Sequence, residues 1–271
     1  MSGRGNCYDS VPVESKSVIN GGITQRSKRM ILFYKGFFMK VILSLLSGYG
    51  GFEKGSNVLD LGCGSGGLVD FLRNKGIDAV GADIKFKKGP NVDKLKSDGF
   101  LKLIDPISMR LPYEDNFFDF VVADQVVEHV KDIDAFAFEV SRVLKSGGTF
   151  IAYYPSRWKL IEPHVGVPLG GVIRWKWWFK LWVSLGAYRT KRSGPPVDAV
   201  MSYLDGKTCY RSLREVRSSF EKFFPSVKFD GVLLLKAFGN WKSRLLLSVP
   251  FAPEVFNALW STLLVTKKNS I

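Results

Sequence analysis

Between residues 57 and 154, short apolar runs alternate with segments whose apolar residues recur at helical spacing. The apolar runs predict strands at 57–61, 78–82, 100–104, 118–123 and 149–154. Helical spacing at 68–75 and 133–144 places helices between them. Parallel neighbouring strands need crossovers of about a dozen residues, so this alternation predicts an α/β fold with a doubly wound, mostly parallel sheet.

The segments on either side extend this prediction. Apolar residues at 27–46 recur at helical spacing and indicate an amphipathic helix. Farther along, 209–224 has a helical pattern, and the apolar runs 228–235 and 261–266 predict the last two strands of a seven-stranded sheet. The predicted parts are a flexible N-terminus (1–26), an N-terminal helix with the core (27–153), an inserted basic and tryptophan-rich lid (154–206) and a C-terminal completion of the sheet (207–271).

A glycine-rich loop follows the first predicted strand. It reads Val58-Leu59-Asp60-Leu61-Gly62-Cys63-Gly64-Ser65-Gly66-Gly67. Glycines at this place let the backbone turn sharply and approach a ligand closely, which suits a nucleotide-like molecule. Because Gly62, Gly64 and Gly67 also satisfy the G-x-G-x-x-G pattern of dinucleotide sites, the loop alone does not identify the ligand.

The residues around the loop narrow the choice. Asp60 lies two residues before the first glycine, and Asp83 lies 19 residues after Gly64 at the end of the second predicted strand, where it can accept hydrogen bonds from ribose hydroxyls. Three further motifs follow at 111–119, 128–129 and 142–148. With these motifs in this order, the chain resembles the class I S-adenosylmethionine-dependent methyltransferases of the small-molecule type, which have a Rossmann-like fold.

The resemblance implies a set of residues that bind S-adenosylmethionine: Asp60, Gly62, Cys63, Gly64, Gly66, Asp83, Ile84, Asp105, Ser108, Met109 and Asp124. The methionine part would lie over the glycine loop, the ribose would meet Asp83, and the adenine would lie at the end of the third strand. One position departs from the family pattern, because Ile107 stands where an acidic residue is common, and Asp105 two residues earlier is the substitute. Cys63 is expected to be a small apolar filler and not a nucleophile.

Methyl transfer requires the acceptor atom to be held in line with the sulfonium, and a base helps when the acceptor is a hydroxyl. The chain has two histidines, His129 and His164, and both are candidate catalytic residues. The alternative for His129 is that it orients the Glu128 loop or touches the cofactor. The alternative for His164 is packing within its own loop. Asp124 borders the expected transfer site or is a solvated carboxylate.

Composition excludes several other classes of protein. Three widely spaced cysteines and two histidines argue against disulfides and against a site with several imidazole ligands, so we expect metal-free chemistry. No apolar run approaches the roughly 20 residues that span a bilayer, and residues 1–22 lack the apolar stretch of a secretory signal. We expect a cytoplasmic protein, with a peripheral position at the membrane as an alternative.

The net charge of +14 is unevenly distributed. Residues 151–271 hold 19 Lys and Arg against 7 Asp and Glu, whereas residues 51–150 hold 13 against 16. This distribution indicates an anionic partner for the flanks or a solubilising basic surface. The segment 173–182 combines four tryptophans with three basic residues, which is typical of a membrane-interface helix; a lid helix packed over the cleft and a nucleic-acid stacking surface are the alternatives.

The sequence therefore favours a methyltransferase that modifies an oxygen, or less readily a nitrogen or carbon, of a small molecule, glycan or lipid-linked acceptor. Two alternatives stay open. An RNA methyltransferase would use the basic C-terminal third. A catalytically silent binding module would keep the fold as a scaffold, although it would have no need for Asp60, Gly62, Gly64 and Asp83.

Overall fold

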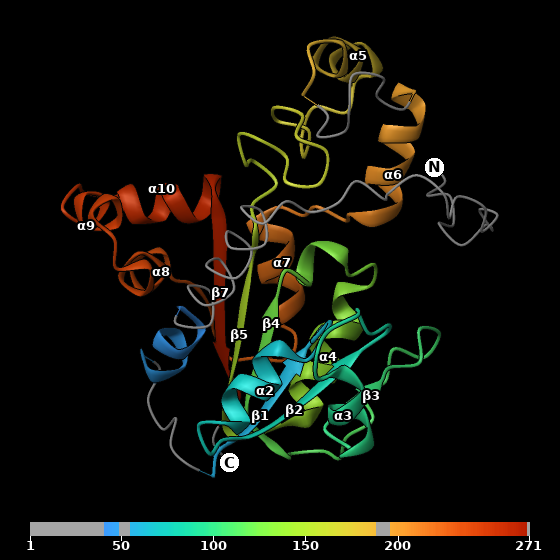
Figure 1. The fold of residues 1–271 in the computed structure, drawn as a ribbon. Helices are drawn as coiled ribbons and strands as arrows, with labels where there is room; N and C mark the ends of the chain where they lie inside the picture. The colour runs from blue at the N-terminus through green and yellow to red at the C-terminus, as the bar shows by residue number, and fades with distance from the viewer. Residues whose placement is uncertain (1–40, 49–54, 188–195, 270–271) are drawn as a thin grey trace. The chain divides into compact units, whose positions relative to one another are not determined.

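Seven strands form one mixed sheet in the computed structural model, which describes residues 41–48, 55–187 and 196–269 (Figure 1). The strands are β1 (Asn57–Leu61), β2 (Asp78–Asp83), β3 (Leu101–Leu103), β4 (Phe118–Asp124), β5 (Leu144–Pro155), β6 (Val227–Phe229) and β7 (Ser261–Lys267). Their order in the sheet is β3-β2-β1-β4-β5-β7-β6. The predicted seven-stranded Rossmann-like sheet is thus confirmed.

Strand direction decides where a ligand can bind. Strands β1 to β5 run parallel, whereas β7 pairs antiparallel with both β5 and β6. The chain leaves β1 for β2 on one side and later returns to β4 on the other side. In open α/β sheets, ligands bind outside the carboxyl ends of the strands at such a switch point. The ends of β1, β2 and β4 are therefore the expected site.

Helices cover the sheet and fill the connections. They are α2 (Gly67–Arg73), α3 (Val92–Ser97), the 3-10 helix η1 (Val127–His129), α4 (Ile133–Val143), α5 (Lys176–Ser184), α6 (Val197–Lys207), α7 (Leu213–Phe220), α8 (Gly231–Phe238), α9 (Trp241–Leu247) and α10 (Ala252–Leu259). Residues 41–48 are also helical and belong to the predicted helix 27–46. The remainder of that helix and the predicted flexible N-terminus lie outside the described residues. No helix among those described is both long and apolar enough to cross a bilayer.

The main core lies between the sheet and the helices α4 and α7. Strand alternation directs Val121 and Ala123 of β4 to this side. Phe136 of α4, Phe150 of β5 and Phe220 of α7 meet there, with the rings of Phe150 and Phe220 stacked at 5.3 Å. This packing fixes the position of the segment after β4, which carries Glu128 and His129.

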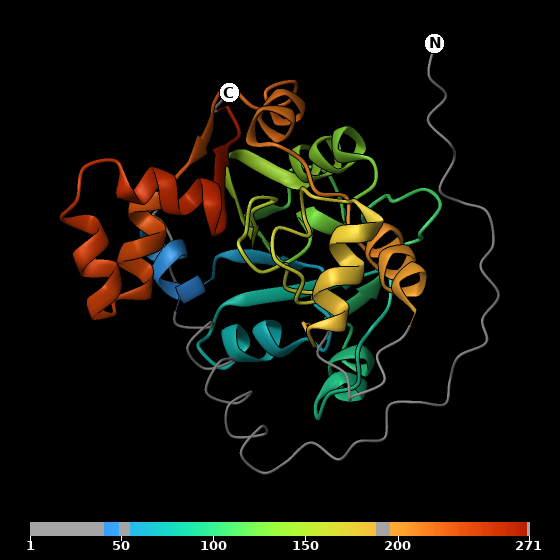
Figure 2. The ribbon, with the colours of Figure 1, turned by 90° about the horizontal axis from the view of Figure 1, so that it is seen from above.

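The predicted strand 228–235 is wrong from residue 230 onward. The strand β6 ends at Phe229, and Asp230 then caps α8 by accepting a hydrogen bond from the Leu233 backbone N–H at 2.8 Å. A short apolar run in the sequence does not distinguish a strand from a buried helix. Here the cap by Asp230 favours the helix. Helices α8, α9 and α10 lie together beside β7 (Figure 2).

The segment between β5 and α7 forms a small packing unit of its own. Helices α5 and α6 lie side by side, and their apolar faces enclose a cluster of buried side chains: Val165, Val167, Phe179, Val200 and Leu204. The segment follows the carboxyl end of β5, so it leaves the sheet at the edge where the ligand site is expected (Figure 1). The predicted helix 209–224 is shorter in the structure, because Ser212 caps α7 with a capping box.

The side chain of Arg142 connects the motif at 142–148 to the motif at 111–119. Its guanidinium donates hydrogen bonds to the carbonyls of Leu111 and Tyr113 and to the carboxylates of Asp115 and Glu139. The side chains of Arg142 and Glu139 are 9% and 12% exposed, so their ion pair is nearly buried, whereas Asp115 is 63% exposed. The two motifs therefore hold the start of β4 against α4.

Replacing Arg142 with Met is expected to lower the free energy of unfolding by about 3 kcal/mol, because it leaves a buried carboxylate without its cation. Urea unfolding followed by circular dichroism measures this difference. Lys94→Met, on the exposed surface of α3, is the matched control and should change stability by less than about 0.5 kcal/mol. Equal stabilities of the two variants would show that the Arg142 network is not a structural anchor.

Candidate active site

The glycine loop connects β1 to α2 in a conformation that needs glycine. The backbone φ is +81° at Gly62, +56° at Gly64 and +69° at Gly66, and residues with a side chain rarely adopt such values. A Cβ at Gly62 would also lie 2.3 Å from Cγ2 of Val126, the residue that precedes η1. The loop is thus pressed against the end of β4.

Asp83 connects the loop to β2. Its Oδ2 accepts a hydrogen bond from the Gly64 backbone N–H at 2.7 Å, and its Oδ1 accepts one from the Lys85 N–H at 3.1 Å. A carboxylate has about four acceptor positions, so Asp83 retains positions for two hydroxyl donors. This geometry is compatible with the ribose contact expected from the sequence.

Buried carboxylates gather at the carboxyl ends of the strands. The pKa of Asp60 is raised to about 8, first by burial and then by the neighbouring carboxylates of Asp124 and Asp83. The pKa of Asp124 is raised to about 7 by burial and by Glu128, while Lys87 lowers it. Burial destabilises the ionised form of these carboxyl groups. A positively charged ligand beside them would stabilise that form, so the site favours a cationic ligand.

The other expected cofactor residues lie around the same edge. Asp105 is exposed, and its carboxylate accepts hydrogen bonds from the backbone N–H groups of Ile107 and Ser108, which lowers its pKa. The carboxylate therefore shapes the turn after β3, and the adenine contact predicted for Asp105 stays a prediction. Met109 adopts a left-handed backbone, with φ of 52°.

Ile84 and Cys63 differ in exposure. Ile84 follows Asp83 and is 56% exposed, as an apolar contact for a bound ligand would be. Cys63 is buried, and burial raises the pKa of its thiol. A thiol that does not ionise at neutral pH is not a nucleophile, so its predicted role as a filler agrees with its surroundings.

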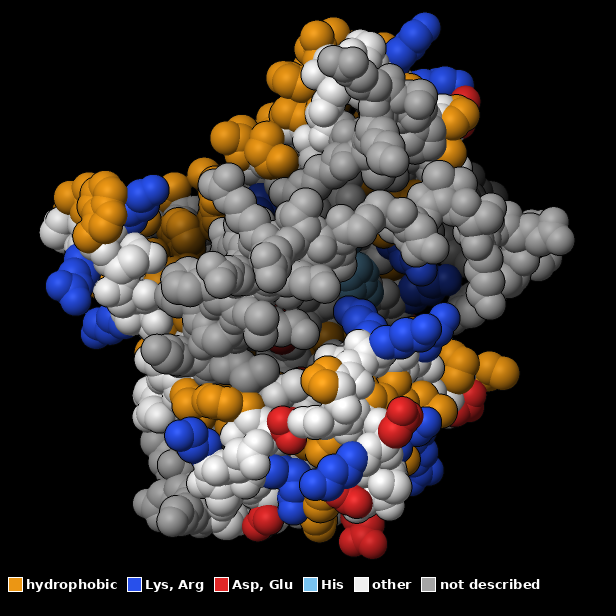
Figure 3. Space-filling view, in the orientation of Figure 1, with side chains coloured by type: hydrophobic (Ala, Val, Ile, Leu, Met, Phe, Trp, Pro, Cys, Tyr) orange, Lys and Arg blue, Asp and Glu red, His pale blue; other side chains and the backbone are white. Residues whose placement is uncertain are grey.

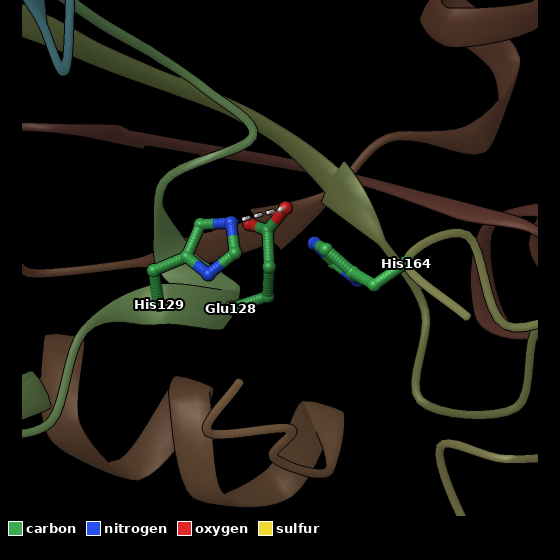
Figure 4. A group of neighbouring side chains, drawn as sticks. All are labelled: Glu128, His129 and His164. Atoms are coloured by element: carbon green, nitrogen blue, oxygen red, sulfur yellow. Dashed lines mark ion pairs between the residues drawn. The ribbon is translucent and has the colours of Figure 1, made fainter. Parts of the chain in front are cut away.

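The two histidines meet at one carboxylate, as Figure 4 shows. Glu128 and His129 lie on η1 after β4, and His164 comes from the segment between β5 and α5. The imidazole rings of His129 and His164 lie edge to face with their centroids 5.2 Å apart. Nε2 of His129 lies 3.7 Å from Oε1 of Glu128.

Each histidine is held through its Nδ1. Nδ1 of His129 lies 2.5 Å from the Lys207 carbonyl, and Nδ1 of His164 lies 2.7 Å from Oε1 of Glu162. Glu162 also accepts a hydrogen bond from the Tyr210 hydroxyl at 2.7 Å. Burial lowers the pKa of His129 below its ordinary value.

Sequence reasoning did not find Glu162 and Tyr210 as supports of this site. The sequence Glu162-Pro163-His164 gave a signal, because a carboxylate two residues before a histidine can fix its ring. Tyr210 gave none, since it lies in a segment predicted as helix. The expectation of metal-free chemistry stays a prediction. Glu128, His129 and His164 nevertheless bring one possible ligand atom each to within 4.8 Å of one another.

The tryptophan-rich helix α5 has two different faces. Trp178 and Trp182 pack against the cluster of the insertion, whereas Trp175 and Trp177 are 60% and 58% exposed and stack on each other at 5.6 Å. Arg174 and Lys176 form ion pairs with Asp205 and Asp198. The packed face contacts the insertion itself, so the lid helix over the cleft stays a prediction, as does the membrane contact of the exposed face.

The sheet order, the glycine loop and the carboxylate at the end of β2 define a Rossmann-like methyltransferase fold. Residues 59–152 match the family model described as "Methyltransferase domain". Residues 59–152 are thus similar to the methyltransferase-domain family, in agreement with the resemblance found in the sequence.

Curated relatives share this domain. A sterol 24-C-methyltransferase of Gibberella zeae is 32% identical over 108 residues, which cover 38% of this chain and 28% of the relative. A ubiquinone biosynthesis O-methyltransferase of Pelagibacter ubique is 32% identical over 131 residues, which cover 46% of this chain and 51% of the relative. The chain therefore spans about half or less of the length of these relatives.

A solved structure supports the fold. The phosphoethanolamine N-methyltransferase 2 of Haemonchus contortus, in complex with S-adenosylhomocysteine, has a TM-score of 0.51 and 15% sequence identity, covering 91% of this chain and 58% of that chain. At this identity the likeness concerns the fold alone. The RNA-directed and catalytically silent alternatives gain no support from these relatives and this structure.

Proposed function

We propose that this protein transfers a methyl group from S-adenosylmethionine to an oxygen of a small, largely apolar acceptor. The observation that carries the proposal is the loop Gly62–Gly66, whose positive φ angles require glycine and which the Asp83 carboxylate holds at the switch point of the sheet. The cofactor supplies a methyl group bound to a sulfonium. The relatives named above act on sterols and quinones, which supports an apolar acceptor over a glycan.

The residues of the site have distinct roles in this proposal. Asp83 holds the ribose hydroxyls, and the buried carboxylates Asp60 and Asp124 offset the positive charge of the cofactor. His129 and His164 lie beyond the end of β4, where the acceptor would approach. The predicted lid, 154–206, would exclude water from the transfer. Positioning of the acceptor matters more in this reaction than acid–base help.

Asp83→Ala is expected to weaken S-adenosylmethionine binding about ten- to a hundredfold, because it removes one or two hydrogen bonds to a charged group. Isothermal titration calorimetry with S-adenosylmethionine measures this change. Asp93→Ala, an exposed carboxylate on α3, is the control and should bind like the unmodified protein. Equal affinities of the two variants, or tighter binding of a nicotinamide dinucleotide than of S-adenosylmethionine, would contradict the proposal.

We also propose a cytoplasmic protein that contacts membranes peripherally through 173–182. Hydrophobic side chains gather over α5 (Figure 3), and Trp175, Trp177 and Leu181 are exposed there. Tryptophan and basic residues together are favoured at a membrane interface.

The expected result is that the protein sediments with vesicles containing phosphatidylglycerol and that the double variant Trp175→Ser, Trp177→Ser loses at least about half of this binding. Leu103→Ser, which changes an equally exposed apolar residue on β3, is the control. Equal sedimentation of the double variant and the unmodified protein would rule out α5 as the membrane contact.

A further inference from the structure

We propose that Glu128, His129 and His164 bind a divalent transition-metal cation of the Zn²⁺ type. Each residue offers one ligand atom, and these atoms all lie within 4.8 Å of one another. The three side chains come from two segments far apart in the sequence and point toward a common centre (Figure 4). Cation binding by these residues is measurable without either substrate of methyl transfer.

The distances are close to those of a metal site. Zn²⁺ binds imidazole nitrogen and carboxylate oxygen at about 2.1 Å, so two ligands of one tetrahedral ion lie about 3.4 Å apart. Nε2 of His129 and Oε1 of Glu128 are 3.7 Å apart, a few tenths of an ångström more than that. All ligand atoms lie within 4.8 Å of one another, so binding requires the widest pair to close by at most about 1.4 Å.

Hydrogen bonds fix the tautomer of both imidazoles. The Lys207 carbonyl and the Glu162 carboxylate can only accept, so Nδ1 of His129 and Nδ1 of His164 each donate a proton to them. In the neutral rings, each Nε2 then carries a lone pair and no proton. Metal-binding histidines are oriented by a carbonyl or carboxylate on the other ring nitrogen in this way.

The Glu128 carboxylate lacks the partner that its burial requires. Its side chain is 1% exposed, and both of its oxygens are buried without a hydrogen-bond partner among the residues that the structure describes. Unpaired buried carboxylates are costly, and two imidazole lone pairs beside it supply no donor. A cation at the centre would satisfy all three groups at once.

The charges around the centre are mixed. Glu162 and Asp124 add negative charge, while Lys87 and Lys207 lie near His129 and Lys159 lies near Glu128. Carboxylates next to the ligands attract a cation, and the lysines oppose it. The ligand atoms therefore have to supply the affinity, which favours an ion that bonds strongly to nitrogen.

The donor set selects the class of ion. Two imidazoles and one carboxylate suit Zn²⁺ and neighbouring transition metals, whereas Ca²⁺ and Mg²⁺ prefer oxygen ligands. Three protein ligands also leave a coordination position open. The role of the open coordination position rests on the proposed function. There the cation would bind an acceptor hydroxyl and lower its pKa, and the hydroxyl proton would pass to solvent. The oxygen then bonds to the methyl carbon as the carbon–sulfur bond breaks, leaving S-adenosylhomocysteine.

The test uses the full chain stripped of metal with a chelator and then titrated with Zn²⁺ by calorimetry. We expect one saturable site, and we expect Co²⁺ in the same site to give the visible absorption of a four- or five-coordinate ion. Glu128→Gln and His164→Gln should each weaken Zn²⁺ binding more than about a hundredfold, and Glu162→Gln about tenfold through the ring of His164. Glu254→Gln, an exposed carboxylate on α10, is the control.

Several outcomes would overturn the proposal. They are no saturable Zn²⁺ binding by the folded chain, equal binding by the Glu128→Gln, His164→Gln and control proteins, or binding of Mg²⁺ in preference to Zn²⁺. A Zn²⁺-dependent rise in Tm that Glu128→Gln removes is a second readout, because a ligand of the native state raises its stability. Failure of S-adenosylmethionine binding with intact Zn²⁺ binding would refute the proposed function alone, and the reverse result would refute the metal site alone.

Discussion

Gly62→Ala is expected to weaken S-adenosylmethionine binding by at least about a hundredfold, equivalent to about 2.8 kcal/mol. The new Cβ would meet Cγ2 of Val126 at 2.3 Å, and the φ of +81° is unfavourable for any residue with a side chain. Both effects displace the loop from its place against Asp83. Overpacking and left-handed strain should also lower the free energy of unfolding by about 2–4 kcal/mol.

The double variant Gly62→Ala, Val126→Ala separates the two causes. Removing Cγ2 of Val126 relieves the clash but leaves the φ of residue 62 unchanged. We expect about half of the lost stability to return, as measured by urea unfolding, and part of the affinity, as measured by calorimetry. Gly99→Ala is the control for strain alone, because Gly99 has a φ of +75° and no atom lies within 4 Å of its Cβ position. Normal binding by Gly62→Ala would show that the cofactor lies elsewhere.

Binding of S-adenosylmethionine at pH 7 is expected to release close to one proton from the protein. The pKa of Asp60 in the ligand-free site is about 8, so its carboxyl group is mostly protonated at pH 7. A sulfonium favours the ionised form. Apparent affinity should therefore rise about tenfold per pH unit between pH 6 and pH 8 and then level off.

Calorimetry in buffers of different ionisation enthalpy counts this proton. Asp60→Asn should bind more weakly and show neither the proton release nor the rise in affinity with pH. The stability of the ligand-free protein should change with pH in the opposite direction to the affinity. Because the pKa of Asp60 is raised in the folded state, the unfolded state loses this proton at lower pH, so the free energy of unfolding falls between about pH 4 and pH 8. A pH-independent affinity in the unmodified protein would mean that Asp60 does not face the cofactor charge.

The core of the fold was predictable because its signals are local. The strand 57–61 has the predicted bounds, since an apolar run closed by a glycine loop allows little else. The strand β7 was predicted, but its antiparallel direction was not. That direction depends on the path of the connection formed by α8, α9 and α10. The helix α8 was predicted as the end of a strand, since the apolar run after Asp230 fits either kind of element, and no element was predicted at α9 and α10.

The site was predictable only in part, for a related reason. Asp60, Gly62 and Asp83 belong to short motifs next to strands, and the structure brings them to one edge of the sheet. The meeting of His129 with His164 depends on the path of the segment after β5, which Val165 and Phe179 fix by packing within the insertion. Such packing partners are not local in sequence. Each histidine could therefore be named, but not their common carboxylate.

Transfer of a labelled methyl group tests the central claim most directly. The purified chain is incubated with methyl-labelled S-adenosylmethionine and with separate lipid, RNA and water-soluble fractions of a cell extract. The variant Asp83→Ala is the control with weakened cofactor binding. The proposed function predicts label in the lipid fraction that depends on the unmodified chain and falls at least about tenfold with Asp83→Ala. Label in the RNA fraction, or in no fraction while the folded chain binds S-adenosylmethionine, would contradict it.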